Sequence, residues 1–142
     1  MRTPPRSVLI IVTRRIGDVL LATPLMRSVK RAWPDTALDV LVFEGTQGAI
    51  TANPDIRRVL TVPERPGWLT HLAFLFRMAR RYDIALSTLH GDRPTLYVFL
   101  AGRFRAGLLN ATRKESWKRS LLHCWAPFDN WNTHTVLMNL AL

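Results

Sequence analysis

The stretch SVLIIVTRRIGDVLLATPLMRSVKR, residues 7–31, decides the fold of this chain. Its first part, residues 8–12, is an unbroken apolar run rich in β-branched side chains, which is typical of a strand buried on both faces of a parallel sheet. From Val19 onward the apolar residues recur at helical spacing, so the stretch predicts a strand, a short loop and a helix. In open α/β sheets, ligands bind outside the carboxyl ends of the strands, where this loop lies.

The loop contains two arginines, a glycine and an acid: Arg14, Arg15, Gly17 and Asp18. Gly17 permits a positive φ or a close backbone approach. Asp18 opens the helix, where aspartate commonly caps the N-terminus, and position alone favours that role. The alternative is a general base at the mouth of a cleft, which takes a proton from a hydroxyl nucleophile within hydrogen-bond reach. Arg14 and Arg15 either hold an anionic substrate beside it or are simply solvated.

Strands and helices alternate along the rest of the chain, which predicts βαβ units, right-handed crossovers and one parallel sheet. Further strands are expected at residues 37–43, 59–62, 84–88 and 103–107, and helices at residues 47–51, 68–81, 94–101 and 133–142. In the helix at 68–81, the side expected to face the core consists of Leu72, Leu75, Phe76 and Ala79.

Length and composition indicate one basic domain. The chain has 142 residues, 48% of them hydrophobic, and 20 Lys+Arg against 10 Asp+Glu give a net charge of +10. Most of these cations are arginines, whose planar fork suits phosphate or carboxylate partners, nucleic acid or an anionic membrane surface. Cys124 is the only cysteine, so no intrachain disulfide can form, as fits a reducing cytoplasm. The apolar run at residues 8–12 is too short for a signal peptide or a membrane span.

The segment 108–131 departs from the alternating pattern because it mixes tryptophans with cations. Such a mixture marks either a membrane-interface segment or a loop that closes over a ligand, and the alternative is a surface helix with its tryptophan face on the core. We expect residues 109–125 to form a mobile flap near the rim of the cleft. Its cations are Arg113, Lys114, Lys118 and Arg119, and the apolar side of its amphipathic helix is Trp117, Leu121, Leu122 and Trp125.

The motif RIGDVLLATP, residues 15–24, stands directly after the first strand and resembles the opening signature of glycosyltransferase family 9. This family contains the heptosyltransferases that build the lipopolysaccharide inner core. The likeness spans nearly the whole chain. It continues at Asn53-Pro54, Tyr82-Asp83, Leu89-His90-Gly91, Ala101-Gly102, Arg105, Gly107, His134 and Asn139.

The resemblance implies a GT-B fold, in which two Rossmann-like domains face each other across a cleft. Residues 1–142 match the amino-terminal, acceptor-side domain, and the carboxyl-terminal domain that binds the nucleotide-sugar is absent from this chain. The implied reaction is inverting transfer of heptose from ADP-heptose to the inner core. Asp18 matches the family's proposed general base. As an isolated domain, the chain is expected to be inactive.

The resemblance also implies partners and a location. The acceptor is phosphorylated and carboxylated, which gives the positive charge a reason, and the enzyme is expected at the inner face of the inner membrane, as a peripheral cytoplasmic protein. No cofactor is implied, and the four histidines lack the spacing of metal ligands. The residues expected to contact substrate are Arg14, Arg15, Gly17, Thr23, His90, Arg113, Lys114, Lys118 and Arg119.

Two other functions remain open. A basic Rossmann-like module could bind nucleic acid or another anionic partner without catalysis, since Trp117 stands among cations, as in proteins that bind single strands. No nucleic-acid motif is present, so nucleic acid is not expected. A dinucleotide-dependent oxidoreductase is disfavoured because the first loop lacks G-x-G-x-x-G and has arginines where glycines are required.

Overall fold

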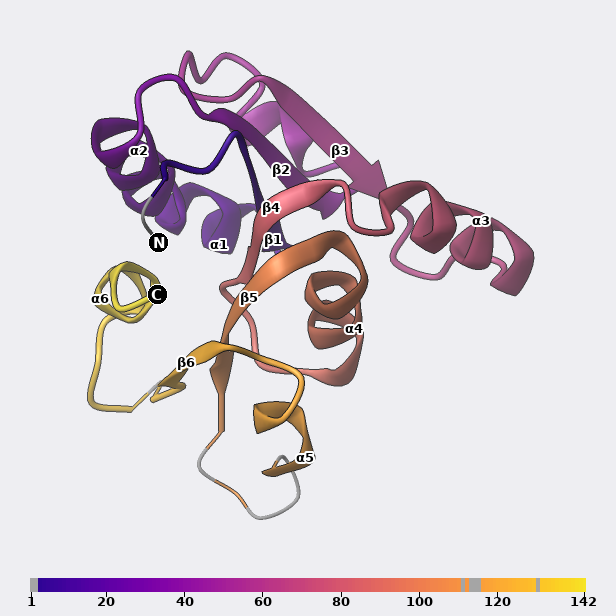
Figure 1. Cartoon of the computed structure of the whole chain (residues 1–142). Coiled ribbons are helices and arrows are strands. Elements are labelled where there is room, and N and C mark those ends of the chain that lie inside the picture. The colour runs from indigo at the N-terminus through magenta and orange to yellow at the C-terminus, as the bar shows by residue number, and fades with distance from the viewer. Residues whose placement is uncertain (1–2, 111, 113–115, 130) are drawn as a thin grey trace.

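The computed structural model describes residues 3–110, 112, 116–129 and 131–142, and places six parallel strands in one sheet (Figure 1). Their order is β3-β2-β1-β4-β5-β6, so the direction of strand addition reverses between β1 and β4. This is the order of a Rossmann-like fold, and it confirms the predicted α/β class. The strands are β1 (Ser7–Val12), β2 (Ala37–Phe43), β3 (Arg58–Val62), β4 (Tyr82–Ser87), β5 (Gly102–Leu109) and β6 (Cys124–Pro127).

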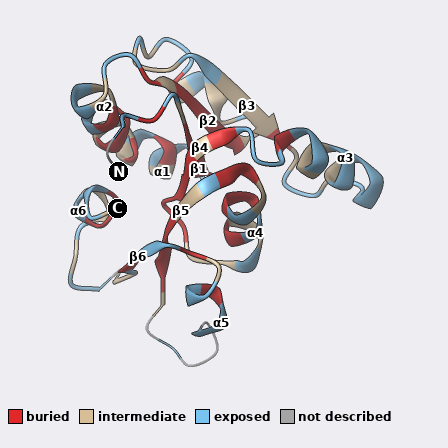
Figure 2. Ribbon diagram, in the orientation of Figure 1, coloured by how far each residue is buried: buried red, intermediate tan, exposed pale blue. Residues whose placement is uncertain are grey.

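Helices cover both faces of the sheet, as predicted. Alternate residues of β1 enter different cores: Ile10 packs with residues of the first two helices, and Ile11 packs with residues of the fourth helix. Both residues are fully buried. Figure 2 shows β1 largely buried, as expected for a central strand of a parallel sheet. The helices are α1 (Ile16–Leu21), α2 (Thr23–Ala32), α3 (Trp68–Met78), α4 (Asp92–Ala101), α5 (Ser116–Arg119) and α6 (Thr135–Leu140), with a 3₁₀ turn, η1 (Gln47–Ala49).

The helix expected after the first loop is divided in two at Ala22. Pro24 has no backbone N–H, so it cannot donate to the carbonyl of Leu20 as an unbroken helix requires. The hydroxyl of Thr23 donates to that carbonyl instead, at 2.7 Å. Pro24 therefore stands in the first turn of α2, where proline is tolerated, and α1 is a short helix that ends beside the loop.

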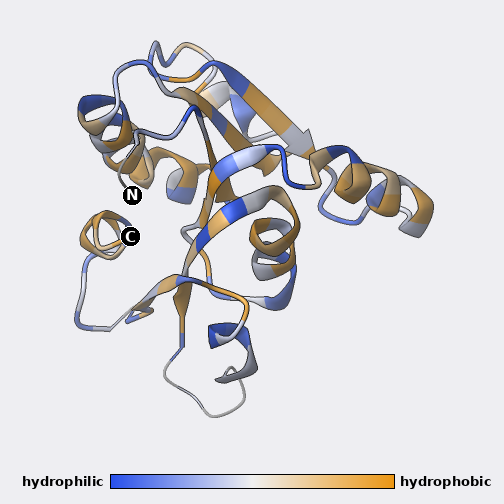
Figure 3. Cartoon of the chain, in the orientation of Figure 1, coloured by the Kyte–Doolittle hydropathy of each residue, from blue (hydrophilic) through white to orange (hydrophobic). Residues whose placement is uncertain are grey.

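The prediction of which side of α3 faces the core is wrong except at Leu75. Phe74, Leu75 and Met78 pack against the core, whereas Leu72 and Phe76 are exposed. Apolar residues surround more than half of this helix (Figure 3), so periodicity alone could not tell which sector the sheet covers. The helix also ends at Met78 instead of 81, and Arg80 follows with a positive φ of 49°.

The tail predicted as a flap contains a strand that the sequence analysis missed. After the single turn of α5, Leu122 enters the core, and Cys124–Pro127 pairs in parallel with β5 as the edge strand β6. The prediction of one amphipathic helix that contains Trp117, Leu122 and Trp125 is therefore wrong. None of the described helices is long and apolar enough to cross a bilayer.

Candidate functional site

A hollow of about 640 Å³ lies at the carboxyl ends of β1, β2 and β3. Its walls come from the loops that follow these three strands, so the topology brings together segments far apart in the sequence. The lining residues are Arg14, Arg15, Asp18, Phe43, Glu44, Thr46 and Glu64. Arg14, Arg15 and Asp18 all line this hollow, so the first loop lies at a cleft, as predicted.

Asp18 does not cap α1, although its position favoured that role. The N-cap residue is Arg15, and no side chain donates or accepts a capping hydrogen bond there. Asp18 stands in the first turn with its side chain 26% exposed, and its Oδ1 lies 3.9 Å from Nη1 of Arg14. An ion pair of this length and exposure contributes little stability, so the carboxylate is not held in a structural role.

Gly17 does not need the positive φ that the sequence suggested. Within the described residues, the glycines with positive φ are Gly45 and Gly91. A Cβ added to Gly17 would meet no atom within 4 Å, because the residue is exposed and faces open space. A close approach of ligand to this backbone stays a prediction.

Two other expected contact residues lie outside the walls of the hollow. The hydroxyl of Thr23 is engaged with the Leu20 carbonyl. His90 follows β4, and its ring packs against Phe128 with 4.0 Å between the ring centroids. Both stand near the carboxyl edge, but the structure does not group them with Asp18.

The cations of the predicted flap divide into three cases. Lys118 is 2% exposed, and its Nζ lies 2.8 Å from Oδ1 of Asp92 at the start of α4, which contradicts its expected role as an accessible cation. Arg119 is exposed, with its guanidinium over the ring of Trp125, 4.5 Å from the centroid. Arg113 and Lys114 lie outside the described residues.

Sequence reasoning missed the acidic residues of the hollow. Glu44 directly follows β2, and Glu64 is the second residue after β3; together with Asp18 they oppose the two arginines. The same rule that singled out the first loop would have found them, because the carboxyl ends of parallel strands meet at one edge. The hollow is therefore of mixed charge, suited to hydroxyl-rich ligands that also carry anionic groups.

Arg93 holds one wall of the hollow in place from α4. Its two terminal nitrogens donate to the carbonyls of Pro63 and Glu64 at 2.7 and 2.6 Å, and its Nε donates to the Tyr97 hydroxyl oxygen at 2.7 Å. The hydroxyl proton of Tyr97 is then available to Nε2 of His71, 3.0 Å away. Burial, and then the charge of Arg93, lower the pKa of His71, which favours its neutral, accepting form.

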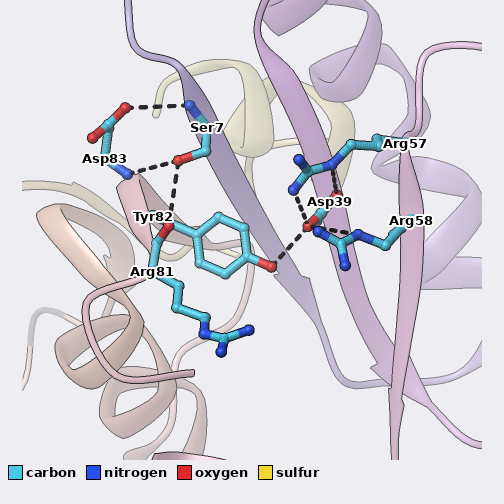
Figure 4. Close-up of polar contacts among 7 residues, drawn as sticks. All are labelled: Ser7, Asp39, Arg57, Arg58, Arg81, Tyr82 and Asp83. Carbon is cyan, nitrogen blue, oxygen red and sulfur yellow. Dashed lines mark hydrogen bonds and ion pairs between the residues drawn. The ribbon is translucent and has the colours of Figure 1, made fainter. Parts of the chain in front are cut away.

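The amino ends of the strands hold a different carboxylate, Asp39 (Figure 4). Its side chain is 0% exposed and accepts two hydrogen bonds from Arg57, at 2.9 and 2.7 Å, and one from the hydroxyl of Tyr82 at 2.8 Å. Arg58 adds an ion pair at 3.8 Å. Burial, followed by the hydrogen bond to Asp39, raises the pKa of Tyr82. These contacts satisfy the carboxylate and make Asp39 a structural residue.

The described residues contain no group of three or more histidines, cysteines or acids placed to hold a metal ion.

No protein-family model matches the chain. The chain is 27% identical, over 134 residues, to lipopolysaccharide heptosyltransferase 3 of Escherichia coli K12, covering 89% of the chain and 38% of that protein. It is 21% identical, over 122 residues, to lipooligosaccharide heptosyltransferase 2 of Haemophilus ducreyi, covering 83% of the chain and 32% of that protein. The chain thus spans about a third of the length of these relatives.

Solved structures give the same result for the fold. The chain resembles a family 9 glycosyltransferase of Veillonella parvula with a TM-score of 0.78 and 17% identity, covering 96% of the chain and 39% of that structure. It resembles the E. coli heptosyltransferase WaaC, solved with ADP, with a TM-score of 0.77 and 24% identity, covering 96% and 45%. The resemblance to family 9 heptosyltransferases is confirmed, and so is the Rossmann-like sheet expected for this part of the fold.

Proposed function

We propose that this chain is the acceptor-side part of an inverting heptosyltransferase, with Asp18 as the general base. The observation that carries the proposal is the carboxylate of Asp18, which stands at the carboxyl-edge hollow and is not used as a helix cap. The similarity to lipopolysaccharide heptosyltransferase 3 over 89% of the chain supports the choice of reaction. The proposed donor is ADP-heptose, and the proposed acceptor is a hydroxyl of the lipopolysaccharide inner core.

In this reaction Asp18 removes the proton of the acceptor hydroxyl as its oxygen attacks the anomeric carbon. The new glycosidic bond forms while the bond to the diphosphate breaks, and the electron pair leaves with ADP. One in-line displacement inverts the anomeric centre without a covalent intermediate, so one base is sufficient. Arg14 and Arg15 are placed to bind anionic groups of the acceptor beside that base.

The donor would be bound by a nucleotide-sugar domain outside the length that this chain matches. We therefore propose that the chain alone binds acceptor and that turnover requires the second domain. We also propose that the enzyme works as a peripheral protein at the inner face of the inner membrane, which would suit an inner-core acceptor. A purely anion-binding module is less well supported, because Glu44 and Glu64 line the hollow together with Asp18.

The test uses two readouts. Binding of a soluble, deacylated core oligosaccharide to this chain should survive Asp18→Asn and weaken about tenfold or more when Arg14 and Arg15 are both changed to glutamine. Turnover should be measured in a chimera in which this chain replaces the matching part of E. coli heptosyltransferase 3. There, Asp18→Asn should lower kcat by about 10²-fold or more with little change in KM.

Glu44→Gln is the matched control, because this carboxylate lines the same hollow but is more exposed. It should leave kcat within a few-fold of the parent chimera. A chimera that turns over normally with Asp18→Asn, or that loses turnover with Glu44→Gln instead, would overturn the assignment of the base.

A further inference from the structure

Helix α3 has an apolar face that the described part of the chain leaves uncovered. Four residues of this face, Trp68, Leu69, Leu72 and Phe76, fall within about 100° of arc on a helix that turns roughly 100° per residue. Trp68 is 75% exposed and Phe76 is 73% exposed. Figures 2 and 3 show the helix at the edge of the molecule, largely exposed and yet largely hydrophobic. A contiguous patch of this kind marks an interaction site.

The opposite side of α3 already anchors the helix to the domain. Phe74, Leu75 and Met78 pack against the second core, and His71 forms a hydrogen bond with Tyr97 of α4. The exposed face is therefore not required to hold the helix in place. The packing of the domain therefore does not explain why this face is apolar.

Positive charge borders this face. α3 contains no acidic residue, and the exposed arginines along its flank and beyond its ends are Arg65, Arg77, Arg80 and Arg81. A hollow of about 510 Å³ beside the helix is lined in part by Arg57, Arg58, Arg77 and Arg81. Two of them, Arg57 and Arg58, form ion pairs there with the buried Asp39. The surroundings of the apolar face are thus strongly cationic.

We propose that α3 docks on an anionic phospholipid bilayer, with its apolar face at the acyl boundary and the bordering arginines at the headgroup phosphates. An apolar face bordered by cations, with a tryptophan at its first residue, is the pattern of helices that lie in a membrane interface. The inference rests on the proposed function, because a lipid-linked acceptor requires the enzyme to dock on the membrane. It also moves the membrane contact from the predicted flap, where Lys118 is buried, to α3.

Vesicle flotation of the full chain tests this without acceptor or nucleotide-sugar. The wild type should bind vesicles of phosphatidylcholine mixed with phosphatidylglycerol, and bind phosphatidylcholine alone more weakly. Trp68→Ser combined with Phe76→Ser should weaken binding on the order of tenfold for each residue changed. Arg77→Gln with Arg81→Gln should weaken it about fivefold per arginine, and added salt should have a smaller effect on that variant.

The matched controls lie on other surfaces: Leu137→Ser on α6 and Arg31→Gln on α2, both at exposed positions. Neither should change vesicle binding. Brominated acyl chains should quench the tryptophan fluorescence of the wild type more than that of Trp68→Phe, which keeps an apolar ring at that position. This difference would show that Trp68 reaches the lipid. Circular dichroism should give the same folded spectrum for every variant.

The proposal fails if the wild type does not bind anionic vesicles, or if the α3 variants bind as well as the controls. It also fails if the wild type does not bind vesicles but light scattering shows a dimer that Trp68→Ser combined with Phe76→Ser dissociates. In that case a second copy of the chain covers the apolar face of α3. Failure here is distinct from failure of the proposed function. Asp18→Asn should still bind vesicles, and the α3 variants should keep turnover on a soluble, deacylated acceptor in the chimera.

Discussion

The two ends of the sheet hold the same pair of residue types, an aspartate beside arginines, in opposite circumstances. At the amino ends, Asp39 is buried and accepts hydrogen bonds from Arg57 and Tyr82. At the carboxyl ends, Asp18 is partly exposed, 3.9 Å from Arg14. A carboxylate whose acceptor sites are filled by protein donors belongs to the fold, whereas one that still faces a hollow is available to a substrate. The surroundings, and not the residue type, separate structure from chemistry.

The largest expected effect is a loss of stability when the carboxylate at the amino ends of the strands is removed. Asp39→Ala should lower the free energy of unfolding by about 2–4 kcal/mol, because the buried hydroxyl of Tyr82 and the guanidinium of Arg57 lose their acceptor. Asp18→Ala should change it by about 0.5 kcal/mol or less, since its ion pair is long and exposed. Urea unfolding of both variants, with unchanged m-values, measures the difference. Equal losses would mean that Asp18 is structural as well.

The next effect compares two glycines. A Cβ on Gly102, at the start of β5, would lie 2.6 Å from Cβ of Ala85 and 2.7 Å from the carbonyl oxygen of Phe104. Gly102→Ala should therefore destabilise the chain by about 1–3 kcal/mol. Gly17→Ala meets no atom within 4 Å and lies in α1, so it should be neutral or stabilising by up to about 1 kcal/mol.

The glycine pair also sharpens the comparison. Comparing the thermal unfolding of the two variants shows whether the amino ends of the strands are more closely packed than the carboxyl ends. If Gly17→Ala keeps full stability but weakens binding of the core oligosaccharide, then its Cβ occupies space that the ligand uses. A destabilised Gly17→Ala would instead show that the carboxyl edge is more closely packed than the structure describes.

The sequence predicted the sheet well because buried parallel strands are apolar runs that need no knowledge of their neighbours. The run at residues 8–12 and the strand at 37–43 illustrate this, and the position of Asp18 at the strand end followed from the same pattern. It could not predict β6, because an edge strand of four residues has too weak a pattern. Nor could it predict the environment of Lys118 or the core side of α3, since both depend on contacts between distant segments.

The role of Arg93 was beyond the sequence for the same reason. Its hydrogen bonds to Pro63 and Glu64 join α4 to the loop after β3, 30 and 29 residues away along the chain. Nothing local marks this arginine as different from the many others. The carboxyl edge is thus shaped by tertiary contacts that only the structure gives, while the amino-terminal strands are encoded locally.

The smallest expected effect is a pH dependence at the carboxyl edge. The pKa of His71 is lowered from 6.5 by burial and by Arg93, so below about pH 6.5 the unfolded chain binds more protons than the folded one. The contribution of this residue to stability is therefore lost as pH falls from 6.5 towards the lowered pKa. Over that window, the free energies of unfolding of the wild type and of His71→Gln, measured in urea, should converge. The change should be smaller than the loss of stability expected for Gly102→Ala. Other titrating groups affect both proteins alike.

The same titration should reach the hollow through one chain of contacts. A protonated His71 cannot accept from the Tyr97 hydroxyl, which also accepts from Arg93, and Arg93 holds the carbonyl of Glu64. We expect the backbone amide signals of residues 64 and 65 in NMR spectra to shift with the midpoint of His71, and to stop doing so in His71→Gln. The amide of Asp39, at the other end of the sheet, should not follow this titration. If it does, the two ends are coupled, and the contrast between them is not a local one.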